Sequence, residues 1–204
     1  MPNRKTGKKI AILTVSLLLL GLLTGCADHA TETEQTTMTI AKDRSVTLII
    51  VEDFTQDYYS QSELQEMILK EAAAYNNSHG ADDISVEKVE VKDQKATVVM
   101  QFATPQAYAA YNNQIFFCGT VEEAVQAGYA MDVPLLQLGE VTRQIGRDEL
   151  MTMADSKLII AEESQQIRLP GEVQYASEGV IVSGKGRTVM LPEEQEGMAY
   201  IIYK

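Results

Sequence analysis

The hydrophobic positions near the start of the chain form one long run. Later hydrophobic positions follow short alternating and helical patterns. The run covers the 14 residues 10–23, with basic residues before it and Thr24, Gly25 and Cys26 after it. A helix of this length extends about 21 Å, less than the ~30 Å hydrocarbon core of a bilayer, so a membrane span is disfavoured. A basic segment, a short apolar segment and small residues together predict a cleavable export signal.

Alternating patterns further along the chain predict hairpins. Residues 37–51 form two such arms around a polar turn, and the second arm is apolar on both faces, which indicates a strand inside a sheet. Residues 84–102 predict a second hairpin. Its first arm changes phase, and a bulge at Glu87 or Lys88 would restore the facing of its side chains.

Helical spacing and capping residues predict one long helix and several short ones. The long helix begins after Ser60 or Ser62 and is expected to end near Asn76. Its apolar stripe is expected to pack on the core and consists of Leu64, Met67, Ile68, Ala72 and Tyr75. Short helices are expected to begin at Thr104, Thr120 and Arg147.

From residue 157 onwards, short apolar runs alternate with turns rich in glycine. We interpret this part as a small barrel or sandwich of its own, ending in a strand that fixes the C-terminus. The expected fold class is α+β, with antiparallel hairpins packed with two or three helices and followed by a β-rich C-terminal part. The expected organisation is a signal peptide at 1–25, a disordered tether at 26–36, an α+β domain at 37–155 and a β-rich subdomain at 156–204.

The segment Leu23-Thr24-Gly25-Cys26 resembles the lipobox of bacterial lipoproteins. The resemblance implies that the signal peptide is cut before Cys26 and that the thiol of this cysteine receives a diacylglycerol. Two acyl chains anchor a protein stably, so the chain is expected on the extracytoplasmic face of the cell membrane. An ordinary cleaved signal, the alternative, would not need a cysteine at the cut. Ala27, the residue after the cysteine, gives no signal for retention in an inner membrane. The sequence therefore leaves open whether the cell envelope has one membrane or two.

Two other segments resemble uncharacterised surface lipoproteins of Gram-positive anaerobes. They are Val51-Glu52-Asp53-Phe54, which is followed by Tyr58-Tyr59, and the segment 117–124. The resemblance covers most of the mature chain. It implies no activity and no catalytic residues for this chain.

Charge limits the class of partner. The full chain carries 17 basic and 29 acidic residues, and loss of the four basic residues in 1–25 changes its net charge from −12 to −16. Because nucleic-acid binding needs a basic surface, nucleic acid is excluded as a partner. The same charge is repelled by anionic lipid, so membrane contact is expected only through the anchor on Cys26. The expected partner is an envelope protein, a peptide or a glycan.

The sequence offers little for catalysis or metal binding. A serine or cysteine triad needs an imidazole beside the nucleophile, and the two histidines are His29 in the tether and His79 in a loop. His79 with Asp82 and Asp83 is better explained as a solvated turn than as a metal site, and no cofactor or metal is expected. Cys118 lies in an apolar run and is expected to be a buried, inert thiol. An extracytoplasmic hydrolase and an envelope-complex assembly factor remain as alternative functions.

The segment Ala-Tyr-Asn-Asn occurs twice, each time at the expected end of a helix. Its residues are the candidate ligand-binding set Tyr75, Asn76, Asn77, Tyr111, Asn112 and Asn113. Tyrosine rings could stack on a glycan or peptide while asparagine amides bind it through hydrogen bonds. The structural alternative, which the sequence favours, is that tyrosine closes an apolar stripe and asparagine takes the left-handed conformation after a helix. Because the sequence shows no catalytic motif, the expected function is a non-catalytic binding or interaction module of the cell surface or envelope.

Overall fold

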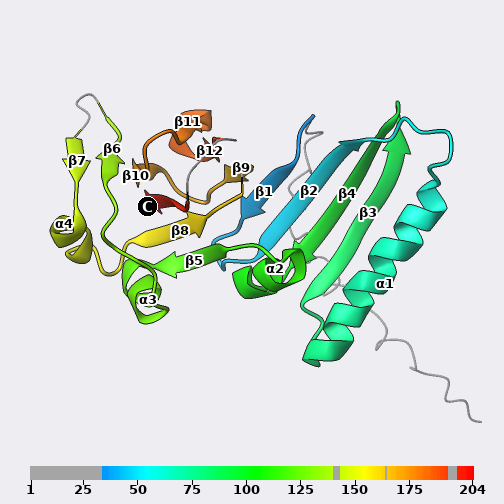
Figure 1. Cartoon of the computed structure of the whole chain (residues 1–204), viewed down its shortest axis with the longest axis horizontal. Coiled ribbons are helices and arrows are strands. Elements are labelled where there is room, and N and C mark those ends of the chain that lie inside the picture. The colour runs from blue at the N-terminus through cyan, green and yellow to red at the C-terminus, as the bar shows by residue number, and fades with distance from the viewer. Residues whose placement is uncertain (1–33, 140–142, 164, 193–196) are drawn as a thin grey trace, which may run out of the picture. The chain divides into compact units, whose positions relative to one another are not determined.

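Strands and helices together give an α+β fold, as the sequence predicts, in the computed structural model (Figure 1), which describes residues 34–139, 143–163, 165–192 and 197–204. The strands are β1 (Thr37–Ile40), β2 (Val46–Asp53), β3 (Ile84–Lys92), β4 (Lys95–Phe102), β5 (Phe116–Thr120), β6 (Leu135–Gln137), β7 (Arg143–Ile145), β8 (Lys157–Ala161), β9 (Gln166–Arg168), β10 (Val173–Ala176), β11 (Ile181–Ser183), β12 (Thr188–Met190) and β13 (Ala199–Tyr203). The α-helices are α1 (Gln61–His79), α2 (Pro105–Asn112), α3 (Val121–Gln126) and α4 (Arg147–Met151).

The predicted signal peptide, Cys26 and most of the predicted tether lie outside the described residues. Their assigned roles therefore stay predictions. Residues Thr33–Lys204 form a single compact unit. Among the described residues, no helix is both long and apolar enough to cross a bilayer.

The two predicted hairpins lie side by side in a seven-stranded sheet, in the order β11-β12-β9-β1-β2-β4-β3. β2 pairs with both β1 and β4, which confirms that this apolar arm is an interior strand. The pairing of β3 with β4 shifts between Val86 and Lys88, so Glu87 is the extra residue of the predicted bulge. The turn between these strands places Asp93 and Gln94 at positive φ, as tight hairpin turns require.

The strands after residue 156 are shared between both sheets. β9, β11 and β12 extend the first sheet, where β9 pairs parallel to β1. β8, β10 and β13 join β5, β6 and β7 in a six-stranded sheet of order β5-β8-β13-β10-β6-β7. The boundary expected at residue 156 thus does not coincide with a division between sheets. The predicted C-terminal strand is present, and Lys204 exchanges two backbone hydrogen bonds with Glu172.

Two hydrophobic clusters form the core. The first is built from both sheets together with α1 and α2, and the second packs one face of the six-stranded sheet against α3 and α4. Because side chains alternate along a strand, Ile159 and Ile201 belong to the first cluster while Ile160 and Ile202 belong to the second. The central strands β8 and β13 are therefore buried on both faces, which explains their continuous apolar sequences.

Helix α1 differs from its prediction at the C-terminal end and on one flank. The Ser60 hydroxyl accepts a hydrogen bond from the Glu63 backbone N–H, but α1 continues to His79 and ends at Gly80, which has φ 67°. The expectation that Met67 packs in the core is wrong, because its side chain is 51% exposed. The buried stripe centres on Ile68 and Ala72, and Met67 lies on its solvent-facing flank.

The shorter helices begin at the predicted capping residues. Thr104 caps α2, and Pro105 occupies its first turn. Thr120 and Glu123 form a complete capping box at α3. The Glu123 carboxylate also pairs with Arg44 at 2.9 Å, so it joins the turn between β1 and β2 to this helix. Helix α4 is present, but it ends at Met151 rather than Met153.

Candidate functional site

The two Ala-Tyr-Asn-Asn segments meet in the folded chain. The rings of Tyr75 at the end of α1 and Tyr111 at the end of α2 lie edge-on, with centroids 5.9 Å apart and an interplanar angle of 79°. His79, one helical turn beyond Tyr75, stacks on its ring with centroids 4.0 Å apart. Both tyrosines are half-buried, so each packs on the core while leaving part of its ring exposed. We call Tyr75, His79 and Tyr111 the Tyr75–Tyr111 surface.

Three of the four asparagines in the candidate set have structural roles. The Asn76 side chain donates to the carbonyl oxygen of Ile84 at 2.8 Å and accepts from the N–H of Ile84 at 3.0 Å. Asn112 donates to the carbonyl oxygen of Tyr108 within α2. Asn113 has the left-handed conformation expected after a helix, with φ 52°. Asn77 is exposed, but it lies two residues from both Tyr75 and His79 on α1, so its side chain does not share their side of the helix.

Tyr111 and Tyr108 remain neutral hydroxyl groups at physiological pH. Burial raises the pKa of Tyr111, and the nearby carboxylate of Glu71 raises it further. Burial also raises the pKa of Tyr108 to about 12, and its hydroxyl donates to Gln114 at 2.8 Å. The surface can therefore stack on a ligand and form hydrogen bonds, but the Tyr111 phenol is a poor base at neutral pH.

A second aromatic group lies at the other end of α1, in the segment between β2 and the helix. Tyr58 and Tyr59 are edge-on with centroids 4.9 Å apart, and Tyr59 lies against Phe54 at 4.8 Å. Tyr58 is 76% exposed and Tyr59 is 45% exposed. We call these three residues the Phe54–Tyr59 patch. All three residues carry part of the resemblance to surface lipoproteins, but none of them is among the candidate ligand-binding residues. The spacing of Phe54, four and five residues before the two tyrosines, was the available signal.

The exposed side of α1 carries a shallow hollow of about 390 Å³. Among the described residues, its lining comes from this one helix and consists of Glu63, Glu66, Met67, Lys70, Glu71 and Ala74. Three acidic side chains thus line an open surface rather than a closed cleft. Such an arrangement suits contact with a partner better than the exclusion of water that catalysis by carboxylates requires.

The other groups considered for chemistry have structural explanations. Cys118 is 2% exposed and forms a hydrogen bond with Tyr203, and burial raises the pKa of its thiol, so the predicted burial is confirmed. His79 uses Nδ1 for a 2.9 Å contact with the carbonyl oxygen of Tyr75. The described residues hold no group of three or more His, Cys, Asp and Glu side chains placed to bind a metal ion. The glycine-containing run Gly184 to Arg187 could also be compared with a phosphate-binding loop, but it is the turn of the β11–β12 hairpin.

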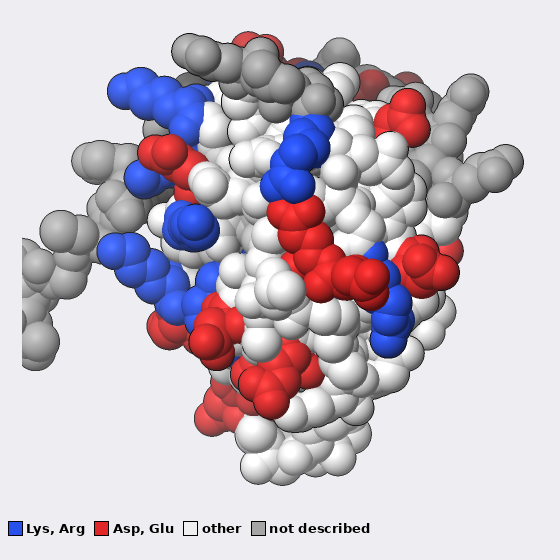
Figure 2. All heavy atoms as spheres, turned by 90° about the vertical axis from the view of Figure 1, so that its left-hand side faces the viewer, with Lys and Arg blue, Asp and Glu red and all other residues white. Residues whose placement is uncertain are grey.

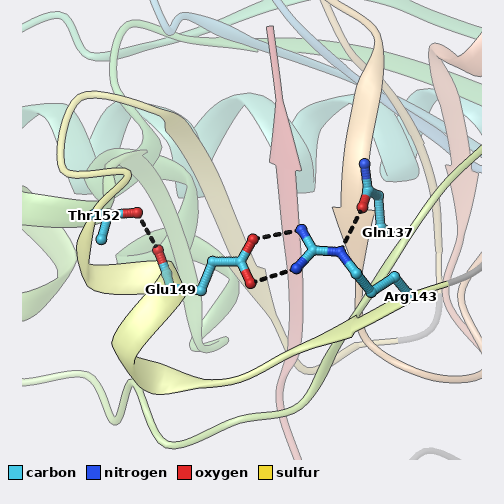
Figure 3. Close-up of polar contacts among 4 residues, drawn as sticks. All are labelled: Gln137, Arg143, Glu149 and Thr152. Atoms are coloured by element: carbon cyan, nitrogen blue, oxygen red, sulfur yellow. Dashed lines mark hydrogen bonds and ion pairs between the residues drawn. The ribbon is translucent and has the colours of Figure 1, made fainter.

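Acidic side chains cross the face of the molecule that carries α3, α4 and β7, with lysine and arginine interspersed among them (Figure 2). Arg143 binds the Glu149 carboxylate through both terminal nitrogens, and its Nε donates to Gln137 at 3.1 Å (Figure 3). Arg143 lowers the pKa of Glu149 through these hydrogen bonds. A carboxylate held in this way is a structural link between β7 and α4 rather than a candidate general acid.

The chain matches no protein-family model, no curated protein sequence and no solved structure. A proposal of function therefore depends on the two aromatic surfaces, on the acidic side of α1 between them and on the predicted export signal.

Proposed function

We propose that this chain is an exported lipoprotein, anchored to the cell membrane through a diacylglycerol on Cys26, and that its folded body is a non-catalytic binding module of the envelope. The basic segment, short apolar run and Leu23-Thr24-Gly25-Cys26 support the anchor. The partner is an envelope protein, a peptide or a glycan, and a net charge of −16 after signal removal argues against nucleic acid.

The observation that carries the binding assignment is the pair of aromatic surfaces at the two ends of α1. Exposed tyrosines with fixed neighbours are typical of recognition surfaces, because they give a large contact area at little cost in side-chain entropy. A hydrolase of the carboxylate or triad type would instead need charged groups converging in a closed cleft. The open acidic side of α1 therefore favours binding over catalysis.

Membrane fractionation of two matched variants tests the anchor. Cys26→Ser removes the proposed lipid acceptor, whereas Cys118→Ser makes the same chemical change at a thiol inside the folded body. We expect loss of membrane retention in the first variant and normal retention in the second. Equal retention of both variants would contradict the anchor.

A photo-crosslinker placed in the anchored protein tests binding. At position 71, which is exposed one helical turn before Tyr75 and whose native carboxylate acts on Tyr111, it should give a discrete crosslinked product on intact cells. At position 185, in the exposed turn of the β11–β12 hairpin, it should not. The same product at both positions, or none at position 71, would count against a binding role for this surface.

A further inference from the structure

The Phe54–Tyr59 patch has an exposure that core packing does not explain. Tyr58 is the most exposed of the large hydrophobic side chains in the described part of the chain, at 76%. Neither hydrophobic cluster includes Phe54, Tyr58 or Tyr59. Three aromatic rings outside any core, with Tyr59 in contact with each of the other two, are the kind of group found at the centre of a protein interface.

The backbone holds the patch in place. The N–H of Phe54 donates to the carbonyl oxygen of Gln94, in the β3–β4 turn, at 2.7 Å. The N–H of Tyr59 donates to the carbonyl oxygen of Gln56 at 3.0 Å, and the next residue, Ser60, caps α1. A partner would meet rings that are already oriented, so little conformational entropy is lost on binding.

The charges around the patch select the chemistry of the partner. Glu52, Asp53 and Asp57 are exposed within the same short segment, and Asp57 directly precedes Tyr58. Lysines are present at this end of the sheet as well, since Lys95 lies opposite Asp53 and pairs in turn with Lys92. These lysines lie on the strands, as Glu52 and Asp53 do, whereas Asp57 lies in the same segment as Tyr58, after β2. A positively charged group is therefore the best complement to the ring and its neighbour.

We propose that the Phe54–Tyr59 patch docks a segment of a partner protein through an arginine side chain. A guanidinium group is planar and stacks on an aromatic face while its N–H donors bind a carboxylate, whereas a lysine ammonium is compact and more strongly hydrated. A glycan would need several polar side chains converging on its hydroxyl groups, and no such convergence is shown among the described residues at Tyr58, where the charged residues of the segment 52–60 are all carboxylates. The proposal rests on the binding role proposed above, but it concerns different residues from the Tyr75–Tyr111 surface.

The experiment titrates the full lipidated protein in nanodiscs with three peptides. Each peptide has eight residues and blocked termini, and the three differ only in the side chain placed at the same four positions. These side chains are arginine, lysine or citrulline, the last of which is nearly isosteric with arginine and neutral. Binding is followed by NMR of ring-labelled tyrosine at low salt. The variants are Tyr58→Leu, Tyr58→Phe and, as a control at another exposed hydrophobic side chain, Ile181→Ser.

We expect the arginine peptide to bind most tightly and the citrulline peptide at least about tenfold more weakly. Tyr58→Leu should weaken binding of the arginine peptide by a similar factor, whereas Tyr58→Phe and Ile181→Ser should leave it unchanged. Equal binding of the arginine and citrulline peptides, or no effect of Tyr58→Leu, would overturn the proposal. Tighter binding of a neutral oligosaccharide, or a Tyr58-dependent association of the protein with itself, would overturn it as well. Crosslinking at position 71 is independent of this result, so failure of the peptide alone leaves the binding module in place.

Discussion

The side-chain amide of Asn76 makes both hydrogen bonds to Ile84 that a neighbouring strand would make. Ile84 begins β3, which is the edge strand of the seven-stranded sheet. Gln61, at the opposite end of α1, donates to the carbonyl oxygen of Val89 on the same strand. Side chains of helix α1 thus bind some of the backbone groups of this edge strand, which would otherwise be open to pairing with a strand of another chain.

The Asn76 amide should contribute measurably to stability. Replacing Asn76 with Ala removes two partly buried hydrogen bonds, so we expect unfolding to become easier by about 1–3 kcal/mol. Asn77→Ala makes the same change in helix propensity at the next, exposed position and serves as the control. Urea denaturation measures both variants, and equal free energies of unfolding would show that the contact with Ile84 contributes nothing.

Glu123 should make stability depend on pH in the acidic range. Its hydrogen bond with Arg44, together with that from the Thr120 N–H, lowers its pKa in the folded chain below the ordinary 4.5. A lowered pKa stabilises the folded state above the unfolded pKa, and this contribution is lost as the pH falls through the folded value. Glu123→Gln should therefore be less stable than the native chain at pH 7, with a difference that shrinks below about pH 4.5.

The comparison for Glu123 is Glu122→Gln on the same helical turn. The Glu122 carboxylate accepts a hydrogen bond from Gln126 instead of from Arg44. Urea denaturation of both variants at several pH values should show the shrinking difference for Glu123→Gln alone. A difference of constant size across this range would rule out the ion pair with Arg44 as its source.

Removal of the hydroxyl group should affect the stability of the protein differently at two buried tyrosines, Tyr200 and Tyr108. Among the described residues the Tyr200 hydroxyl is buried with no hydrogen-bond partner, whereas the Tyr108 hydroxyl donates to Gln114. Tyr200→Phe should leave stability unchanged or raise it by up to about 1 kcal/mol, and Tyr108→Phe should lower it by about 1 kcal/mol. Thermal unfolding of the two variants checks this, and a comparable loss of stability in both would mean that Tyr200 has an unrecognised partner.

The elements that depend on local sequence could be predicted from it. Capping residues such as Thr104 and Thr120 mark the starts of helices because they bind backbone N–H groups within one turn. The phase change in the first arm of the second hairpin predicted a bulge at Glu87 or Lys88, since a strand with one buried face must keep its register, and the bulge is found at Glu87. The predicted end of α1 was less accurate, because Gly80 takes the left-handed position more easily than Asn76.

The long-range pairings could not be predicted. The parallel contact between β1 and β9 joins Met38 to Ile167, and nothing in either short apolar segment selects the other. The same limit applies to the candidate site. The repeated Tyr-Asn segments indicated that Tyr75 and Tyr111 were of interest, but their contact depends on α1 and α2 packing against one shared cluster. The structural use of Asn76 likewise depends on β3, which lies beyond the helix.

Intact-mass measurement of the protein extracted from membranes tests the proposed lipoprotein most directly. We expect a chain that begins at Cys26 and carries the additional mass of a diacylglycerol on this residue. The same preparation of Cys118→Ser should show the same lipid increment, because Cys118 is buried in the folded body. A chain that still begins at Met1, or one that begins at residue 26 with an unmodified thiol, would contradict the account.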